Sequence, residues 1–326
     1  MLRNITVGFP GLGIEGGVLD NVAFRIGENF EVMWYGVVIA LGMLCAILYA
    51  SLRCKQVGIS VDDLTDIAIF TILFGVIGAR LYYVAFSPSQ FKSLLDIINL
   101  RTGGLAIYGG IIAGALTIFV CCLIKKISWR ALFDCVGPGV MIAQAAGRWG
   151  NFFNGEAYGG IVSETSPLYF LRMGLISQNT VYDFNTLSMV YVHPTFLYES
   201  LWNILGFILI NIFFKKKKFD GQIALYYFGW YGFGRMFIEG LRTDALFIGD
   251  TGIRVSQLLG FLLFAVASAL LVYGLIYVKN NPTSKLAYVQ GFSLPEEPET
   301  VAQDESDADT EAPEQTAEAS EATEEQ

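Results

Sequence analysis

The sequence is poor in metal-binding side chains, because it has one histidine, His193, and five cysteines among 326 residues. The cysteines follow no CxxC or other metal-ligand spacing, and a lone histidine gives no ligand set. We therefore expect no metal and no organic cofactor. The cysteines are predicted to be reduced structural thiols.

Charged residues are also scarce, at 16% of the chain, and several long segments are almost free of them. Crossing about 30 Å of hydrocarbon takes roughly 20 mostly apolar residues. Five segments meet this requirement: 33–52, 64–86, 103–124, 194–214 and 255–278. Segments 131–149 and 221–239 are richer in polar residues or glycine and are predicted to be irregular helices lining a cavity. The sequence thus predicts an all-α polytopic membrane protein with seven transmembrane helices.

The N-terminal residues lack the basic region and short apolar core of a cleavable signal peptide, so the first span is expected to act as the insertion signal. The alternating segment VAFRIGENFEV (22–32) indicates a short strand or an interfacial element. Residues 1–32 are predicted to form an extracytoplasmic segment that precedes the membrane domain at 33–278.

Lysine and arginine are distributed unequally between the loops on the two sides of the predicted spans. Eleven lie on the side of the C-terminus: Arg53, Lys55, Lys125, Lys126, Arg130, Lys215, Lys216, Lys217, Lys218, Lys279 and Lys285. Because Lys and Arg are retained in cytoplasmic loops, this side is predicted to be cytoplasmic. The N-terminus and a small head formed by the loop 150–193 are then predicted to face outward.

Acidic residues are concentrated in the last 31 residues of the chain. Thirteen of the thirty lie in 296–326, a stretch that has no lysine or arginine. Such a composition cannot bury enough apolar surface to become ordered. The cytoplasmic tail 279–326 is therefore predicted to be disordered and acidic from about residue 295.

Arginine, glutamate and asparagine residues interrupt the apolar pattern at two places. The stretch QAAGRWGNFFNGEAYGG (144–160) contains Arg148, Asn151, Asn154 and Glu156 directly after an apolar segment. Arg235 and Glu239 lie four residues apart and share one face of another apolar segment. Ionisable side chains at membrane depth usually mark a substrate or ion pathway. We expect the two clusters to form one buried, hydrated site near the outer leaflet.

Several motifs in this order resemble one bacterial family. RWGNFFNGEAYG, HPTFLYES and GRMFIEGLR, preceded by WYG and GGLAIYGG, are similar to motifs of the phosphatidylglycerol:prolipoprotein diacylglyceryl transferases. The resemblance covers about residues 34–278. It implies a seven-helix cell-membrane enzyme with the N-terminus outside. Such an enzyme transfers diacylglyceryl from phosphatidylglycerol to the thiol of a lipobox cysteine in a prolipoprotein and releases glycerol phosphate, as the first step of lipoprotein maturation.

The resemblance assigns Arg148 and Arg235 to catalysis, which suits guanidinium groups because they bind phosphate through planar, paired donors. The alternative is that these arginines only pair with Glu156 and Glu239 to hold helices together. Those carboxylates are candidates either to orient the arginines or to receive the thiol proton. Orientation is favoured, because a neighbouring guanidinium depresses a carboxyl pKa and weakens the base.

Tyr108 occupies a place where many members of the family have a histidine proposed as the base for the cysteine. An ordinary tyrosine hydroxyl, with a pKa near 10, is a poor base at neutral pH. Tyr108 is therefore a catalytic candidate whose role as the base is open.

Further residues are expected to bind phosphatidylglycerol: Arg148, Asn151, Asn154, Tyr35, Gly109, Gly110 and Gly159. Several have simpler alternatives. Tyr35 can be an interfacial anchor, Gly109 and Gly110 can serve helix packing, and Gly159 can be only geometric. Supporting roles are expected for His193, Glu199 and Arg242, and Arg80 is a further candidate for guiding an anionic headgroup.

Two other functions compete with an enzyme on pattern alone. A transporter or channel for a small anion would also place charges centrally, but the two halves of the chain show no convincing repeat. A noncatalytic membrane scaffold does not explain two buried Arg–Glu clusters. The expected partners are phosphatidylglycerol, a prolipoprotein lipobox peptide and the membrane, with no nucleic acid.

Overall fold

A bundle of long helices dominates the structure, a computed structural model that describes residues 4–27, 30–91, 93–99, 103–177 and 189–290. Seven helices in these ranges have 19 residues or more: α1 (Trp34–Gln56), α2 (Val61–Phe86), α4 (Ile107–Lys125), α5 (Trp129–Asn154), α6 (Thr195–Phe213), α7 (Gln222–Leu241) and α8 (Val255–Asn280). Within the described part of the chain, five helices are long and apolar enough to span a membrane, namely α1, α2, α4, α8 and α6 with its following turn. The expected helical membrane protein is confirmed at this level.

The surface of these helices is apolar, in contrast to that of a water-soluble protein. Leu41, Leu48 and Ile112 each expose more than half of their surface, whereas Glu199 and Asn203 are about 5% exposed. Water would disfavour such a large exposed apolar area. The arrangement suits helices that face lipid and keep their polar side chains inside the bundle.

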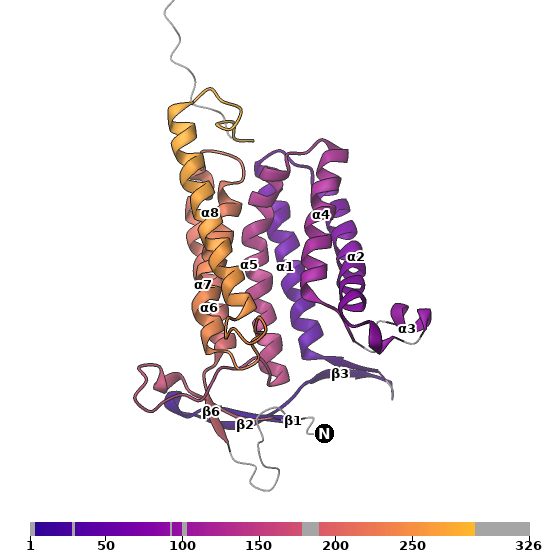
Figure 1. The fold of residues 1–326 in the computed structure, drawn as a ribbon, viewed down its shortest axis with the longest axis vertical. Helices are drawn as coiled ribbons and strands as arrows, with labels where there is room; N and C mark the ends of the chain where they lie inside the picture. Colours follow the sequence, from indigo (N-terminus) through magenta and orange to yellow (C-terminus); the bar gives the residue numbers. More distant parts are fainter. Residues whose placement is uncertain (1–3, 28–29, 92, 100–102, 178–188, 291–326) are drawn as a thin grey trace, which may run out of the picture. The chain divides into compact units, whose positions relative to one another are not determined.

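Helix α5 lies in the middle of the bundle and packs against α1, α6 and α7 (Figure 1). Close approach to α1 depends on small residues. A Cβ atom at Gly139 would lie 2.9 Å from the Ala46 carbonyl oxygen, and one at Gly42 would lie 3.0 Å from Ala146 Cβ. Because its neighbours cover it, α5 tolerates polar residues, such as Asp134, that a lipid-facing helix would not.

The strands gather at one end of the bundle, which we call the strand end (Figure 1). β1 (Asn4–Phe9), β2 (Ile14–Asp20), β5 (Met173–Ile176) and β6 (Val190–Val192) form an antiparallel sheet in the order β2-β1-β5-β6. β3 (Val22–Ile26) pairs with β4 (Phe30–Met33), and β4 leads directly into α1. The sequence indicates one short strand or an interfacial element within 22–32, and the structure has two paired strands there.

Chain direction decides which helix termini meet at the strand end. The first turns of α1, α4, α6 and α8 and the last turns of α2, α5 and α7 lie there, and the short helix α3 (Leu94–Ile98) connects α2 to α4 (Figure 1). Arg53, Lys125 and Lys279, which the sequence groups on one side, belong to the final turns of α1, α4 and α8. They therefore share the opposite end of the bundle.

That opposite end is held together by a buried ionic network around Lys217. Its Nζ lies 3.0 Å from Asp134 Oδ2 and 2.9 Å from Asp220 Oδ1, and the side chains of Lys217 and Asp134 are fully buried. Asp134 also accepts hydrogen bonds from the backbone N–H groups of Gly221 and Ala224, each at 2.9 Å. The network fixes the turn between α6 and α7 to the first turns of α5.

Removal of the Lys217 charge is expected to destabilise the protein strongly. In Lys217→Met the Asp134 carboxylate remains buried without its countercharge, and loss of one partner of a buried pair costs about 3–5 kcal/mol. The measurement is unfolding of purified protein in detergent, with Lys218→Met as a matched control because the Lys218 side chain is exposed. Equal stability of the two variants would contradict the structural role of Lys217.

Candidate active site

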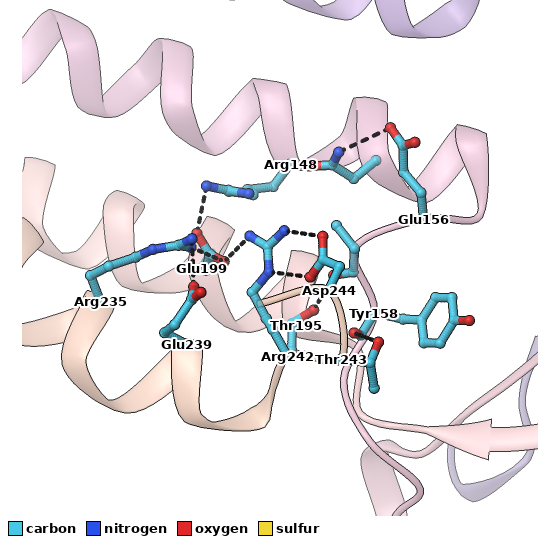
Figure 2. Close-up of polar contacts among 12 residues, drawn as sticks. Arg148, Glu156, Tyr158, Thr195, Glu199, Arg235, Glu239, Arg242, Thr243 and Asp244 are labelled. Carbon is cyan, nitrogen blue, oxygen red and sulfur yellow. Dashed lines mark hydrogen bonds and ion pairs between the residues drawn. The ribbon is translucent and has the colours of Figure 1, made fainter. Parts of the chain in front are cut away.

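Glu199 is the centre of a buried charged cluster at the strand end. Its Oε2 lies 2.7 Å from Arg148 Nη2, and its Oε1 lies 3.1 Å from Arg235 Nη1. Arg242 Nη1 approaches the same Oε1 at 3.5 Å. One carboxylate therefore contacts three guanidinium groups, as Figure 2 shows.

The fold brings these groups together from three helices that are distant in sequence. Arg148 belongs to the last turns of α5, Glu199 to the first turns of α6, and Arg235 to the last turns of α7. Because α6 runs antiparallel to α5 and α7, these turns meet at the strand end. The predicted convergence of the clusters around Arg148 and Arg235 is confirmed.

The second carboxylate of the cluster is Glu239, whose Oε2 lies 2.5 Å from Arg235 Nη2. This contact confirms the predicted pairing of Arg235 and Glu239 across one helical turn. The Glu239 side chain is almost fully buried. Arg235 is thus held from both sides, by its own helix and by Glu199.

Arg242 is held by a carboxylate that sequence reasoning missed. Asp244 accepts from Arg242 Nε at 3.0 Å and from Nη2 at 2.7 Å, in a bidentate pair. Partial burial alone would raise the Asp244 pKa, but the hydrogen bonds and positive charge of Arg242 outweigh it, so the pKa lies below its usual value. The spacing R-x-D directly after a helix end was the available signal.

Arg148 is the most accessible of the three arginines. Its side chain is 22% exposed, compared with 13% for Arg235 and 11% for Arg242. Among the described residues, Glu199 is the only ion-pair partner of Arg148, and the contact uses one terminal nitrogen. The remaining guanidinium donors of Arg148 can therefore face a ligand.

Glu156 interacts with asparagines rather than with Arg148. Its Oε1 accepts hydrogen bonds from Asn151 Nδ2 at 3.2 Å and from Asn154 Nδ2 at 3.1 Å. Helix α5 ends at Asn154 and is capped by Gly155, which has a positive φ of 61°. The chain then turns so that Glu156 lies back over its own helix. The alternative that Arg148 pairs with Glu156 is wrong, because the carboxylate partner of Arg148 is supplied by α6.

Backbone pairing links the sheet to the charged cluster. Gly159 N donates to the His193 carbonyl at 2.9 Å, His193 N donates to the Gly160 carbonyl at 3.0 Å, and Gly160 N donates to the Leu241 carbonyl at 2.8 Å. The hydrogen-bonded ladder therefore continues from β6 through the loop after α5 to the residue that precedes Arg242. The sheet is thereby connected through backbone hydrogen bonds to the segment that carries Arg242.

Gly159 is required by this close contact. A Cβ atom there would lie 2.6 Å from His193 Cβ and 3.0 Å from the Leu241 carbonyl oxygen, so no side chain fits without movement. The His193 ring has its own partner, since Nδ1 lies 3.3 Å from the Tyr198 hydroxyl. Burial lowers the His193 pKa and favours the neutral imidazole. Both residues thus support the loop beside the cluster.

The remaining candidates lie on other helices. A Cβ atom at Gly150 would lie 2.9 Å from Tyr35 Cδ2, so Tyr35 of α1 packs against α5 two residues beyond Arg148. Gly109 lies at the contact between α4 and α2, where a Cβ atom would lie 2.4 Å from the Gly78 carbonyl oxygen. Gly110 is on the same side of α4, near Gly75. These two glycines serve helix packing in this structure.

Tyr108 lies in the first turn of α4, which packs mainly against α2. Within the described ranges, the structure records no hydrogen bond or ion pair between Tyr108 and the charged cluster. Nothing in the geometry therefore assigns Tyr108 the task of a base.

Arg80 does not present its charge to a headgroup, contrary to expectation. Its donors reach five backbone carbonyl oxygens at 2.5 to 2.9 Å: those of Asp96, Ile97, Asn99, Gly103 and Gly104. The guanidinium also lies over the Phe91 ring, 4.9 Å from its centroid. Arg80 thus fixes the segment between α2 and α4.

An apolar cavity of about 290 Å³ lies between α5 and α6 beside the cluster. Trp149 and Ser200, the sequence neighbours of Arg148 and Glu199, line it together with Met141, Ala145, Ile204 and Phe207. Trp149 Nε1 lies 3.2 Å from Ser200 Oγ.

In the described part of the chain, no group of three histidine, cysteine or acidic residues is arranged to hold a metal ion.

Comparison with known proteins places the chain in a family. The family described as prolipoprotein diacylglyceryl transferase matches residues 21–273. A protein of Clostridium kluyveri named phosphatidylglycerol–prolipoprotein diacylglyceryl transferase is 43% identical over 256 residues, which cover 78% of this chain and 96% of the relative. Similarly named proteins of Clostridium perfringens and Listeria welshimeri are each 42% identical and cover 78% and 81% of this chain, and 95% and 92% of their own length. The chain belongs to the prolipoprotein diacylglyceryl transferase family.

Proposed function

We propose that this protein transfers the diacylglyceryl group of phosphatidylglycerol to the thiol of the lipobox cysteine of a prolipoprotein. The product is a thioether-linked lipoprotein precursor, and glycerol phosphate is released, in the first step of bacterial lipoprotein maturation. The observation that carries the proposal is the cluster of three arginines around Glu199, at one end of a bundle of membrane-spanning helices. Membership of the family supports the same reaction.

In this reaction the cysteine thiol loses its proton to water, and the thiolate sulfur forms a bond to a glyceryl carbon while the bond from that carbon to the phosphate oxygen breaks. The electron pair of the broken bond passes to the phosphate, so negative charge increases on its oxygens in the transition state. Arg148 and Arg235 are assigned to these oxygens. Glu199 and Glu239 already hold Arg235 in place, so little reorganisation is needed when charge develops.

Other residues are assigned to the lipid headgroup. Asn151 and Asn154 offer neutral polar groups on the last turn of α5, where Glu156 orients both amides. Tyr35 lies against the same turn and can donate its hydroxyl to the headgroup. The apolar cavity beside Trp149 and Ser200 suits an acyl chain.

The proposed reaction also implies how the helices cross the membrane and which end of the bundle faces outward. We infer that α5 and α7 also span the bilayer, which gives seven transmembrane helices in a membrane domain at 33–278. The strand end, with residues 1–32 and the head at 150–193, then faces outward, because the lysine-rich opposite end is retained in the cytoplasm. This places the cluster near the outer leaflet, where exported prolipoproteins arrive. The predicted acidic tail beyond residue 290 lies outside the described residues.

Loss of either principal arginine is expected to abolish transfer. Arg148→Ala and Arg235→Ala should each lower kcat/KM by about 100-fold or more, because removal of one preorganised donor costs about 3 kcal/mol in the transition state. The assay combines purified protein, labelled phosphatidylglycerol and a lipobox peptide, and detects thiol-linked lipid. Arg25→Ala is the matched control, since this arginine is 56% exposed on the β3–β4 hairpin. Near-normal turnover in both test variants would refute the assignment.

Neutralisation of Glu199 is expected to impair turnover while leaving the helices in place. Glu199→Gln keeps the side-chain shape but removes the charge that three arginines share, so their repulsion should displace them and lower kcat by about tenfold or more. Glu164→Gln, on the exposed head loop, serves as the control. A kcat equal to that of the control would show that Glu199 does not orient the arginines.

The Tyr108 hydroxyl is expected to be dispensable. A cysteine thiol with a pKa near 8.5 is already about one tenth thiolate near pH 7.5, so Tyr108→Phe and Tyr108→His should both retain activity within about threefold. The same transfer assay, run as a pH profile, tests this expectation. A loss of 100-fold in the phenylalanine variant, restored by histidine, would instead identify Tyr108 as the base.

A further inference from the structure

Two tryptophans, Trp202 of α6 and Trp230 of α7, join these helices by ring stacking and by hydrogen bonds. The rings of Trp202 and Trp230 are stacked with their centroids 4.1 Å apart and their planes 14° apart. Each indole also donates a hydrogen bond to the other residue's backbone. Trp202 Nε1 lies 3.1 Å from the Trp230 carbonyl oxygen, and Trp230 Nε1 lies 2.9 Å from the Trp202 carbonyl oxygen. The contact is therefore reciprocal.

Each indole lies over a glycine of the opposite helix, four residues beyond the tryptophan there. A Cβ atom at Gly206 would lie 2.3 Å from Trp230 Nε1, and one at Gly234 would lie 2.2 Å from Trp202 Nε1. The same W-x3-G spacing thus occurs in both helices and fits together as a pair. We call Trp202, Gly206, Trp230 and Gly234 the tryptophan clasp.

The clasp adjoins the charged cluster on both helices. Glu199 precedes Trp202 by three residues, and Arg235 directly follows Gly234. The Glu199–Arg235 ion pair therefore lies about one helical turn from the stacked rings. Any rotation or sliding of α6 against α7 at the clasp would be transmitted to this ion pair through rigid helix.

In a lipid environment, a directional contact such as this one is needed to fix the register of two helices. Apolar side chains gain little by leaving lipid for another helix, so apolar packing alone fixes the register of two membrane helices weakly. Directional indole hydrogen bonds and rings that fit only over glycine select one register. A misplacement of about 1 Å at a reacting centre can cost about 100-fold in rate.

We propose that the tryptophan clasp is a positioning device that sets the register of α6 against α7 so that Glu199 holds Arg235 in its catalytic place. This inference rests on the proposed transferase function. The clasp residues act through the ion pair and are not assigned any contact with the substrate.

The test compares two glycine substitutions on the same helix. Gly234→Ala places a methyl group where the Trp202 indole lies, whereas Gly229→Ala meets only Ala267 Cβ at 3.9 Å, an ordinary contact. We expect Gly234→Ala to lower kcat per folded molecule by about tenfold or more, with KM for phosphatidylglycerol changed less than threefold. Its near-ultraviolet circular dichroism should also lose the signal of the stacked indoles. Gly229→Ala should change neither kcat nor this signal.

Trp202→Phe provides a second, milder variant in case Gly234→Ala does not fold. It keeps an aromatic ring but loses one of the reciprocal hydrogen bonds, so a smaller fall in kcat with unchanged KM is expected. Trp129→Phe is its control, because Trp129 begins α5 at the opposite end of the bundle. Folded Trp202→Phe protein with the kcat of this control would overturn the proposal. Absence of transfer by the unsubstituted protein would refute the proposed function instead.

Discussion

The structure depends on holding three positively charged side chains close together in a largely buried site. Three guanidinium groups at the strand end repel one another, and each loses water when the helices pack. Glu199 makes this possible because its two oxygens contact all three, while Glu239 and Asp244 each hold one arginine from a second side. The charges are thus balanced locally, and Arg148 keeps donors directed away from Glu199.

Helix packing in lipid cannot depend on a general tendency of apolar surfaces to associate, so this bundle uses shape and hydrogen bonds. Glycines at the contacts of α1 with α5 and of α2 with α4 allow close approach of backbones. The tryptophan clasp adds direction to the contact of α6 with α7. At the opposite end, the buried Lys217 network ties α5 to the turn between α6 and α7. Together these contacts fix the three helices that carry the charged cluster.

The sheet at the strand end is part of the same construction. Its hydrogen-bonded ladder extends through Gly159 and Gly160 to Leu241, so backbone hydrogen bonds connect the sheet to the last residue of α7. The same ladder therefore holds the backbone directly before Arg242. This close backbone pairing explains why Gly159, which has no side chain, is needed beside the charged cluster.

The sequence alone determined the helical membrane class and the placement of Arg235 and Glu239 on one helix face, because span length and helical spacing are local properties of the chain. It did not determine which carboxylate pairs with Arg148. Glu199 lies 51 residues beyond Arg148, and the sequence predicts only a supporting role for it. Arg80 is predicted to guide an anionic headgroup, whereas its donors bind backbone carbonyl oxygens. Those outcomes were decided only in the tertiary structure, since a buried charge takes its partner from whichever helix packing brings within hydrogen-bonding distance.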